Sequence, residues 1–279
     1  MQTGATHTVT ANGAKIPALG FGTFRMPGPD TLRMVPHVLK LGFRHIDTAQ
    51  IYGNEAEVGE GIAASGVARG DIFLTTKVWV DNYPHDAFLA SVDESLRKLK
   101  TDYVDLLLLH WPNEAVPLAA QIGALNEVRN AGKVRHIGVS NFNTALMAEA
   151  IRLSEAPLVT NQIEVHPYLD QSKVIGAARA AGLAVTAYYA MADGKVFADP
   201  VLKDIAGRHG RSVAQVVLRW LVQQDGMVVL SKTVSEARAG ENLAIFDFEL
   251  APDDMAAIQT LAEPDGRLVS PKGLAPHWD

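Results

Sequence analysis

The chain has 279 residues, of which 48% are hydrophobic and 20% are charged, and this balance predicts one globular domain spanning residues 1–279. Its formal net charge of −6 argues against nucleic acid or an anionic membrane surface as a partner. Because the chain contains no cysteine, disulfide bonds, thiolate catalysis and cysteine-bound metals are excluded.

The N-terminal residues Met1–Thr6 lack the charged-then-apolar pattern of a secretion signal. No apolar stretch in the chain approaches the roughly 20 residues that a membrane-spanning helix needs. The sequence therefore predicts a cytoplasmic protein.

Strand-like and helix-like segments alternate along almost the whole chain. The first is a hairpin over Thr8–Ile16, centred on Asn12-Gly13, which we expect to close the floor of a barrel. Strands are predicted at 18–24, 45–49, 72–78, 104–110, 134–140, 159–165, 184–190 and 228–232. Helices are predicted at 54–65, 84–99, 117–131, 143–154 and 171–181, with a pair across 199–224.

Several of these helices end at a glycine, as at Gly66, Gly132 and Gly182, where a C-cap is expected. The alternation without a linker predicts an α/β fold, a (β/α)₈ TIM barrel with an N-terminal β-hairpin. A doubly wound dinucleotide fold would need Gly-x-Gly-x-x-Gly after an early strand. Gly20-Phe21-Gly22 and Gly59-Glu60-Gly61 begin that pattern but do not complete it, so this alternative is disfavoured.

Four chemically active residues, Asp47, Tyr52, Lys77 and His110, lie at or just past the ends of predicted strands. Asp47 and Lys77 are 30 residues apart (77 − 47), and Lys77 and His110 are 33 apart (110 − 77), about one strand–helix unit each. Successive units around a barrel would bring all four to one rim, where barrel enzymes have their active sites.

These residue types suit a proton-donating site. A buried Lys77 needs a counter-charge, and Asp47 is the natural partner. The pKa of a tyrosine is about 10, and we expect the nearby cation to lower that of Tyr52. His110 can orient a carbonyl oxygen toward Tyr52, the general acid. Singly, each residue has a structural explanation, such as a loop tyrosine or a buried ion pair; together the four favour catalysis.

The segments Gly42–Glu55, Leu109–Pro112, Gly138–Phe142 and Asn161–Pro167, with Lys232-Thr233 after them, resemble the signature of the aldo-keto reductases. The resemblance runs in order from the hairpin to about residue 262. It implies a barrel that uses NADPH to reduce a small-molecule carbonyl substrate. It also implies Tyr52 as acid, Lys77 and Asp47 as the groups that tune it, and His110 as the orienting residue.

The resemblance further implies a cofactor site at the strand ends. The implied contacts are Gly22, Thr23, Asp47, Ser140, Asn141, Gln162, Tyr188, Met191, Lys232, Thr233, Arg238, Glu241 and Asn242. Ser140, Asn141 and Gln162 would hold the nicotinamide carboxamide, and an aromatic residue would stack on its ring. Lys232 and Arg238 surround the start of a helix with Ser235 as N-cap, which suits a 2′-phosphate.

Two positions depart from the family pattern. Tyr189-Ala190-Met191 stands where Ser-Pro-Leu is usual, so that either Tyr188 or Tyr189 could provide the stacking ring. Ser231-Lys232-Thr233 replaces Pro-Lys-Ser and keeps both a cation and a hydroxyl.

Residues Arg267–Asp279 and Tyr188–Lys195 resemble a bacterial subgroup, the 2,5-diketo-D-gluconate reductases of the B type, which also reduce methylglyoxal. The short C-terminal run predicts a modest tail over the active-site mouth. The predicted substrate contacts are Tyr52, Trp79, His110, Trp111 and Trp278, whereas Trp220 lies inside a predicted helix and is expected in the core.

Two other functions compete with this one. A regulatory or sensor subunit could keep the NADPH site while controlling a partner, although the complete set of four catalytic residues argues against it. A metal-dependent hydrolase could use Glu164 and His166, which face the same side of one strand, but no further ligand set is evident, so no metal is predicted. We expect the protein to be a monomer.

Overall fold

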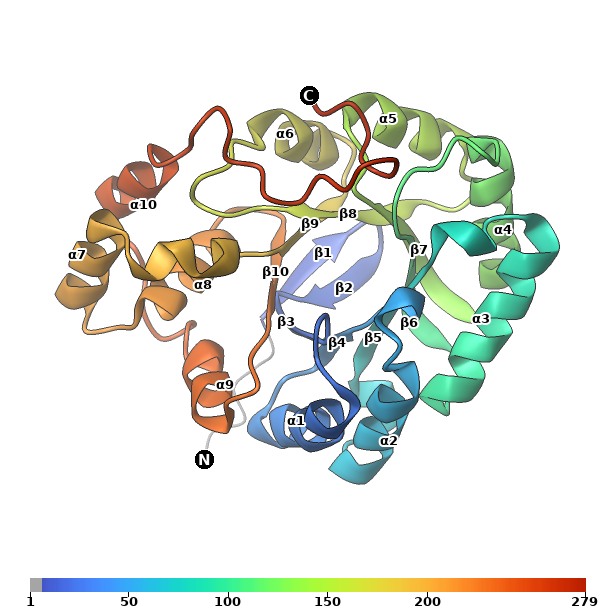
Figure 1. The fold of residues 1–279 in the computed structure, drawn as a ribbon, viewed down its shortest axis with the longest axis horizontal. Helices are drawn as coiled ribbons and strands as arrows, with labels where there is room; N and C mark the ends of the chain where they lie inside the picture. Colours follow the sequence, from blue (N-terminus) through green and yellow to red (C-terminus); the bar gives the residue numbers. More distant parts are fainter. Residues whose placement is uncertain (1–6) are drawn as a thin grey trace.

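The computed structural model describes residues 7–279, and parallel strands at its centre close into a barrel (Figure 1). The barrel order is β10-β3-β4-β5-β6-β7-β8-β9, and β10 pairs with β3 through Val229–Leu19 to close the ring. These strands are β3 Leu19–Gly22, β4 His45–Asp47, β5 Phe73–Val78, β6 Val104–Leu109, β7 Val134–Ser140, β8 Leu158–Glu164, β9 Ala184–Tyr188 and β10 Met227–Ser231.

Helices surround the strands on the outside (Figure 1). The α-helices are α1 Gly28–Leu41, α2 Glu55–Ser65, α3 His85–Leu99, α4 Leu118–Asn130, α5 Thr144–Leu153, α6 Ser172–Ala180, α7 Pro200–His209, α8 Val213–Val222, α9 Glu236–Leu243 and α10 Pro252–Gln259. The short 3-10 helices are η1 Gln50–Tyr52, η2 Arg69–Asp71, η3 Val80–Asn82 and η4 Ala192–Phe197. In α3 the buried apolar face consists of Phe88, Val92, Leu96 and Leu99.

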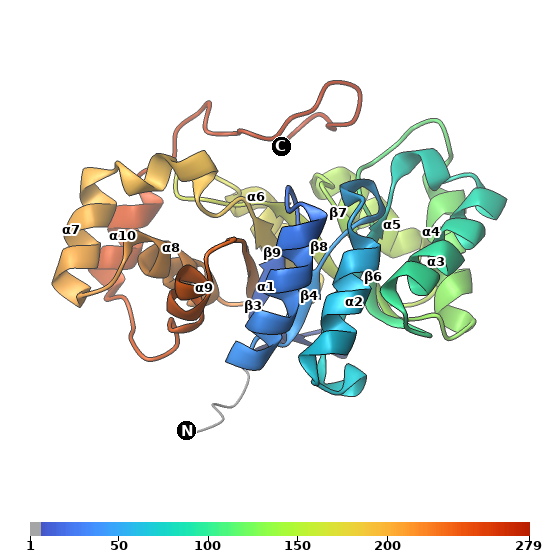
Figure 2. The ribbon, with the colours of Figure 1, turned by 60° about the horizontal axis from the view of Figure 1, so that its bottom comes forward.

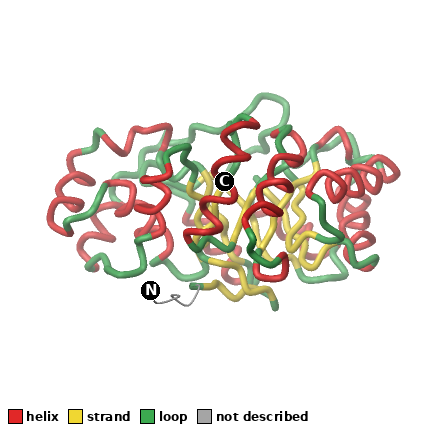
Figure 3. Tube along the Cα trace, turned by 90° about the horizontal axis from the view of Figure 1, so that it is seen from below, coloured by secondary structure: helices red, strands yellow, loops and turns green. Residues whose placement is uncertain are grey.

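The predicted hairpin closes the floor of the barrel. Strands β1 (Thr8–Ala11) and β2 (Ala14–Pro17) pair antiparallel across Asn12 and Gly13, whose φ angles of 44° and 89° give the left-handed turn that Asn-Gly favours. Ile16 of β2 packs with side chains inside the barrel: Phe73, Leu106, Leu108, Val159 and Val228. The hairpin lies behind the centre of the ring in Figure 1 and at its lower edge in Figure 3.

The predicted strands and C-caps are confirmed. Each predicted strand boundary lies within two residues of the observed one, and Gly66, Gly132 and Gly182 follow their helices at φ of 74°, 78° and 75°. Helices α1 and α10 were not among the predicted ranges. Both begin beside a proline, and α1 also contains Pro36, so these segments resemble turns in the sequence.

The last residues, after α10, cross the open end of the barrel opposite the hairpin (Figure 2). This is the end at which the carboxyl termini of the strands emerge, so the predicted tail over the mouth is present. Within residues 7–279 no helix combines the length and apolar character needed to span a membrane. Met1–Thr6, on which the prediction about secretion depends, lie outside the described residues.

Candidate active site

Lys77 is the centre of the cluster at the carboxyl ends of the strands. Its Nζ donates to Oδ1 of Asp47 at 2.6 Å, to the main-chain oxygen of Thr48 at 2.9 Å and to the hydroxyl of Tyr52 at 3.2 Å. The second carboxylate oxygen of Asp47 accepts a hydrogen bond from Nε2 of Gln162 at 2.8 Å. Lys77 and Asp47 are both buried, so each charge is compensated by the other.

Burial outweighs the expected lowering of the Tyr52 pKa by the Lys77 ammonium. Burial raises the pKa of Tyr52 above its usual value; the Lys77 ammonium lowers it only in part, and Asp47 raises it again. Burial would lower the pKa of Lys77, but Asp47 and Tyr52 outweigh it and that pKa is also raised. Tyr52 therefore carries its proton at neutral pH, beside a lysine that is charged.

His110 adjoins the same cluster as a neutral imidazole. Burial, and then the charge of Lys77, place the pKa of His110 well below its usual value. Its ring meets the ring of Tyr52 edge-on at 5.7 Å between centroids, and that of Trp79 at 5.3 Å. The structure therefore brings together all four residues predicted from the strand ends.

A second polar cluster spans the ends of β7, β8 and β9. The hydroxyl of Ser140 donates to the main-chain oxygen of Gln162 at 2.8 Å, and Nδ2 of Asn141 donates to the main-chain oxygen of His110 at 2.9 Å. The hydroxyl of Tyr188 donates to Oδ1 of Asn141 at 2.6 Å. Tyr189 points elsewhere, since its hydroxyl accepts from Arg25 at 3.5 Å.

The loop after β3 borders the cluster through Gly22 and Thr23. Gly22 pairs with Asp47, and the Thr23 hydroxyl donates to the main-chain oxygen of Asp47 at 3.1 Å. Asn54, which sequence reasoning did not single out, donates to the main-chain oxygens of Thr23 and Met26 at 2.9 and 3.2 Å. The signal in the sequence that could have identified Asn54 is its position in the segment Gly42–Glu55, two residues after Tyr52.

The predicted phosphate-binding residues lie after β10, at the start of α9. Ser235 is the N-cap of α9, and its hydroxyl accepts from the main-chain N–H of Arg238 at 3.4 Å. Lys232 and Arg238 are exposed, and neither forms an ion pair with any of residues 7–279. Two free cations beside a helix N-terminus fit a phosphate. Thr233 is half-buried; Asn242 is buried and Glu241 exposed in α9.

Comparison with known proteins gives the family. The family model described as "Aldo/keto reductase family" matches residues 18–263, which include every barrel strand. The chain belongs to the aldo/keto reductase family. It is therefore an oxidoreductase of that family, and the resemblance seen in its motifs is confirmed.

Several relatives in the family cover nearly the whole chain. Methylglyoxal reductase DkgB of Salmonella typhimurium is 45% identical over 267 residues, covering 95% of this chain and 99% of the relative. A crystal structure described as a putative 2,5-diketo-D-gluconic acid reductase B is 68% identical, with a TM-score of 0.98 and 99% coverage of both chains. A mutant of Gox0644, crystallised in complex with NADPH, is 34% identical, with a TM-score of 0.89 and coverage of 95% and 97%.

Aromatic side chains surround the mouth of this aldo/keto reductase. The rings of Trp111 and Trp278 meet at 6.3 Å, and the ring of Trp79 lies 5.3 Å from that of His110, while Trp220 is buried in α8 as expected. Phe24 was not among the aromatic residues predicted at the mouth. Its ring lies 5.0 Å from that of Tyr52, and its side chain is 46% exposed. It follows Thr23 in a loop where no periodic pattern marks it.

Glu164 anchors the tail. Its carboxylate oxygens accept the main-chain N–H groups of Leu268 at 2.7 Å and Val269 at 2.9 Å, and one of them also contacts Nε2 of His166 at 2.9 Å. Arg267 lies 3.7 Å over the ring of Trp278. Of the two residues considered above as metal ligands, Glu164 thus holds the tail and His166 contacts Glu164; the described residues contain no group of three such ligands.

Proposed function

We propose that this protein is an NADPH-dependent reductase of small aldehydes, ketones and α-dicarbonyls, with methylglyoxal and 2,5-diketo-D-gluconate-like keto sugar acids as the candidate substrates. The observation that carries the proposal is the contact of Lys77 with both Asp47 and Tyr52, beside a neutral His110, in an aldo/keto reductase barrel. The names of the relatives support the substrate class.

Each residue of the cluster has one role in this proposal. Tyr52 donates its proton to the carbonyl oxygen as the carbon is reduced, and the Lys77 ammonium, 3.2 Å from the hydroxyl, stabilises the phenolate that remains. Asp47 balances the charge of Lys77. His110 donates an imidazole N–H to the carbonyl oxygen and so holds it toward Tyr52.

The residues at the strand ends fit NADPH, whose part in the reaction is to supply a hydride. Ser140, Asn141 and Gln162 present amide and hydroxyl groups for the carboxamide. We assign the stacking role to Tyr188, because it contacts Asn141 and Tyr189 does not. Lys232, Thr233 and Arg238 would bind the 2′-phosphate. The remaining contacts would be Gly22, Thr23, Asp47, Met191, Glu241 and Asn242.

Trp79, Trp111 and Trp278, with Tyr52 and His110, would form a compact, partly apolar substrate pocket. In this proposal residues 1–279 form one domain, and the protein acts in the cytoplasm as a monomer. It has neither nucleic acid nor a membrane as a partner. The net charge of −6 supports the last point.

The Tyr52→Phe variant tests the proposal. It should lower kcat for methylglyoxal by at least about 100-fold, because the positioned acid is lost. NADPH affinity, measured by fluorescence titration, should change little, because the proposed cofactor contacts lie elsewhere. A variant that kept more than a tenth of the turnover would exclude Tyr52 as the acid. A wild-type protein that bound NADPH yet reduced no carbonyl would favour the sensor role.

A further inference from the structure

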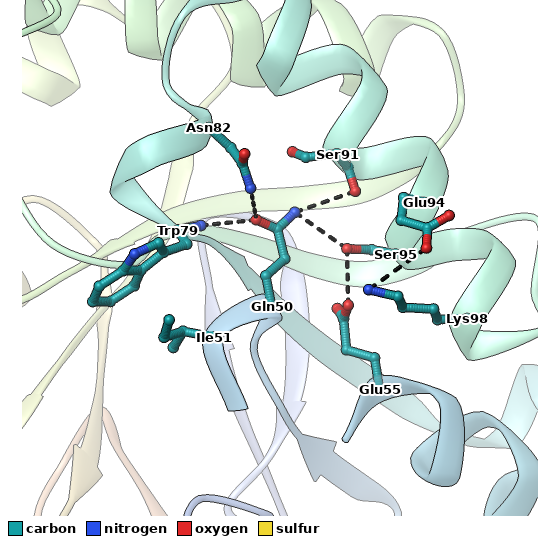
Figure 4. A pocket seen from close by; sticks show the side chains of 9 residues that line it. All are labelled: Gln50, Ile51, Glu55, Trp79, Asn82, Ser91, Glu94, Ser95 and Lys98. Carbon is teal, nitrogen blue, oxygen red and sulfur yellow. Dashed lines mark hydrogen bonds and ion pairs between the residues drawn. The ribbon is translucent and has the colours of Figure 1, made fainter. Parts of the chain in front are cut away.

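Gln50 joins three segments of the barrel rim (Figure 4). It is the first residue of η1, the short helix that ends at Tyr52. Its Oε1 accepts hydrogen bonds from the main-chain N–H of Trp79 and from Nδ2 of Asn82, each at 2.9 Å. Its Nε2 donates to the main-chain oxygen of Ser91 and to the hydroxyl of Ser95, each at 3.2 Å.

These bonds connect the two aromatic side chains that flank His110. Tyr52 follows Gln50 by two residues, and Trp79 receives the Gln50 contact on its own main chain. Both rings meet the His110 ring edge-on, at 5.7 and 5.3 Å. The distance between the proposed acid and one wall of the mouth therefore depends on the Gln50 amide.

Packing supports that connection on one side only, because Val80 and Tyr83 of the η3 loop are buried in the core whereas the side that faces Gln50 is open. A cavity of about 200 Å³ borders Gln50, between η1 and α3, and Ile51 next to it is 50% exposed. On the open side, dispersion contacts contribute little to the position of the loop. There the hydrogen bonds of Gln50 to Trp79 and Asn82 hold the η3 loop against η1.

Through the η3 loop, Gln50 also influences the position of Trp111, which borders the mouth on another side. Tyr83 directly follows Asn82, and its hydroxyl donates to the main-chain oxygen of Trp111 at 2.7 Å. The η3 loop held by Gln50 therefore carries the contact that holds Trp111.

We propose that Gln50 is a positioning residue that sets the width of the carbonyl pocket by fixing the Trp79 loop relative to Tyr52. This inference rests on the proposed function. Gln50 acts through Trp79 and leaves the acid itself in place, because Lys77 and not Gln50 contacts the Tyr52 hydroxyl.

Replacement of Gln50→Met, which keeps the length of the side chain and removes the amide, should raise KM for methylglyoxal by about tenfold through misplacement of the wall. We expect kcat to change less than twofold and NADPH affinity to be unchanged. Asn82→Ala removes one of the four bonds and should raise KM less. Ser91→Ala is the matched control: it lines the same cavity, but Gln50 contacts only its main-chain oxygen, so KM should stay as in the wild type.

A second readout does not depend on activity. With 5-fluorotryptophan incorporated, the ¹⁹F resonance of Trp79, assigned with Trp79→Phe, should shift in Gln50→Met, while that of Trp220 should not. An unchanged KM and an unchanged Trp79 resonance in the folded variant would overturn the inference, and so would a fall in kcat at constant KM. A wild type without carbonyl reduction would refute the proposed function instead, and the ¹⁹F result would still decide the role of Gln50.

Discussion

The Lys77 ammonium has three acceptors, the carboxylate of Asp47, the carbonyl of Thr48 and the hydroxyl of Tyr52, and all lie within 3.2 Å. Removing one partner of a buried ion pair costs about 3–5 kcal/mol, because the remaining charge is uncompensated. The cost explains why the two charges must occur together, one at the end of β4 and the other near the end of β5. As a result, the Lys77 ammonium lies at a fixed position on one side of the Tyr52 hydroxyl.

A single substitution can test whether Arg238 binds the 2′-phosphate. Arg238→Ala should weaken NADPH binding by about tenfold or more, since charge-assisted contacts are worth about 1.5–3 kcal/mol. NADH, which lacks the 2′-phosphate, should bind almost as before and serves as the internal control. Calorimetric titration with both nucleotides measures the difference. Equal weakening of both would show that Arg238 supports α9 rather than the phosphate.

Among the elements, the C-terminal tail is held at both ends. Glu164 binds its start through Leu268 and Val269, and Thr144 binds its end through the carboxylate of Asp279, with N–H and hydroxyl contacts of 2.9 and 2.6 Å. Between these anchors the tail places Trp278 against Trp111. A short segment without helix or strand is ordered here by a buried carboxylate.

Glu164→Gln should loosen the start of the tail, because the amide nitrogen cannot accept an N–H. Hydrogen exchange of the Leu268 and Val269 amides should become at least about tenfold faster, as expected for the loss of a charge-assisted hydrogen bond. Ser270→Ala is the control, since it removes only the hydroxyl that accepts from Trp278. Unaltered exchange in Glu164→Gln would show that packing alone holds the tail.

The sequence predicted elements best where a single pattern dominates. The strands β5 and β6 are short buried runs that end just after Lys77 and just before His110, so their positions and the gathering of the cluster followed from spacing. Helix α1 was not predicted because Pro36 lies inside it. The network of Gln50 and the anchoring by Glu164 depend on contacts between distant segments, and no local pattern encodes such contacts.

For the whole molecule, stability in acid depends on His45 inside the barrel. Its ring is fully buried, with Nε2 3.0 Å from the Thr75 hydroxyl and the ring edge-on to Phe73. The close approach requires glycine at position 20, where a Cβ would lie 2.8 Å from the His45 ring. Burial, opposed in part by Asp47, lowers the pKa of His45 from 6.5 to about 4.

A lowered folded-state pKa means that the unfolded chain binds the proton first. The contribution of His45 is therefore complete above pH 6.5 and is lost as pH falls toward 4. Between pH 7 and pH 5 the loss should be about 2 kcal/mol. Urea unfolding should show this fall in the wild type and a smaller one in His45→Gln, which can still donate to Thr75. Parallel pH curves for the two proteins would assign the acid sensitivity to other groups.

The closure of the barrel between β10 and β3 has a consequence for biosynthesis. Ser231 donates to the main-chain oxygen of Gly20 at 3.4 Å although 211 residues separate them, so the ring stays open until the last strand has left the ribosome. Thr23 and Lys232 directly follow the paired strands β3 and β10. A nucleotide that contacts both residues would stabilise the pairing of these strands in the newly closed chain. Mass action then favours the closed form as the ligand becomes more abundant. If the proposed NADPH site is correct, the lifetime of the protein in the cell would in this way follow the supply of that nucleotide.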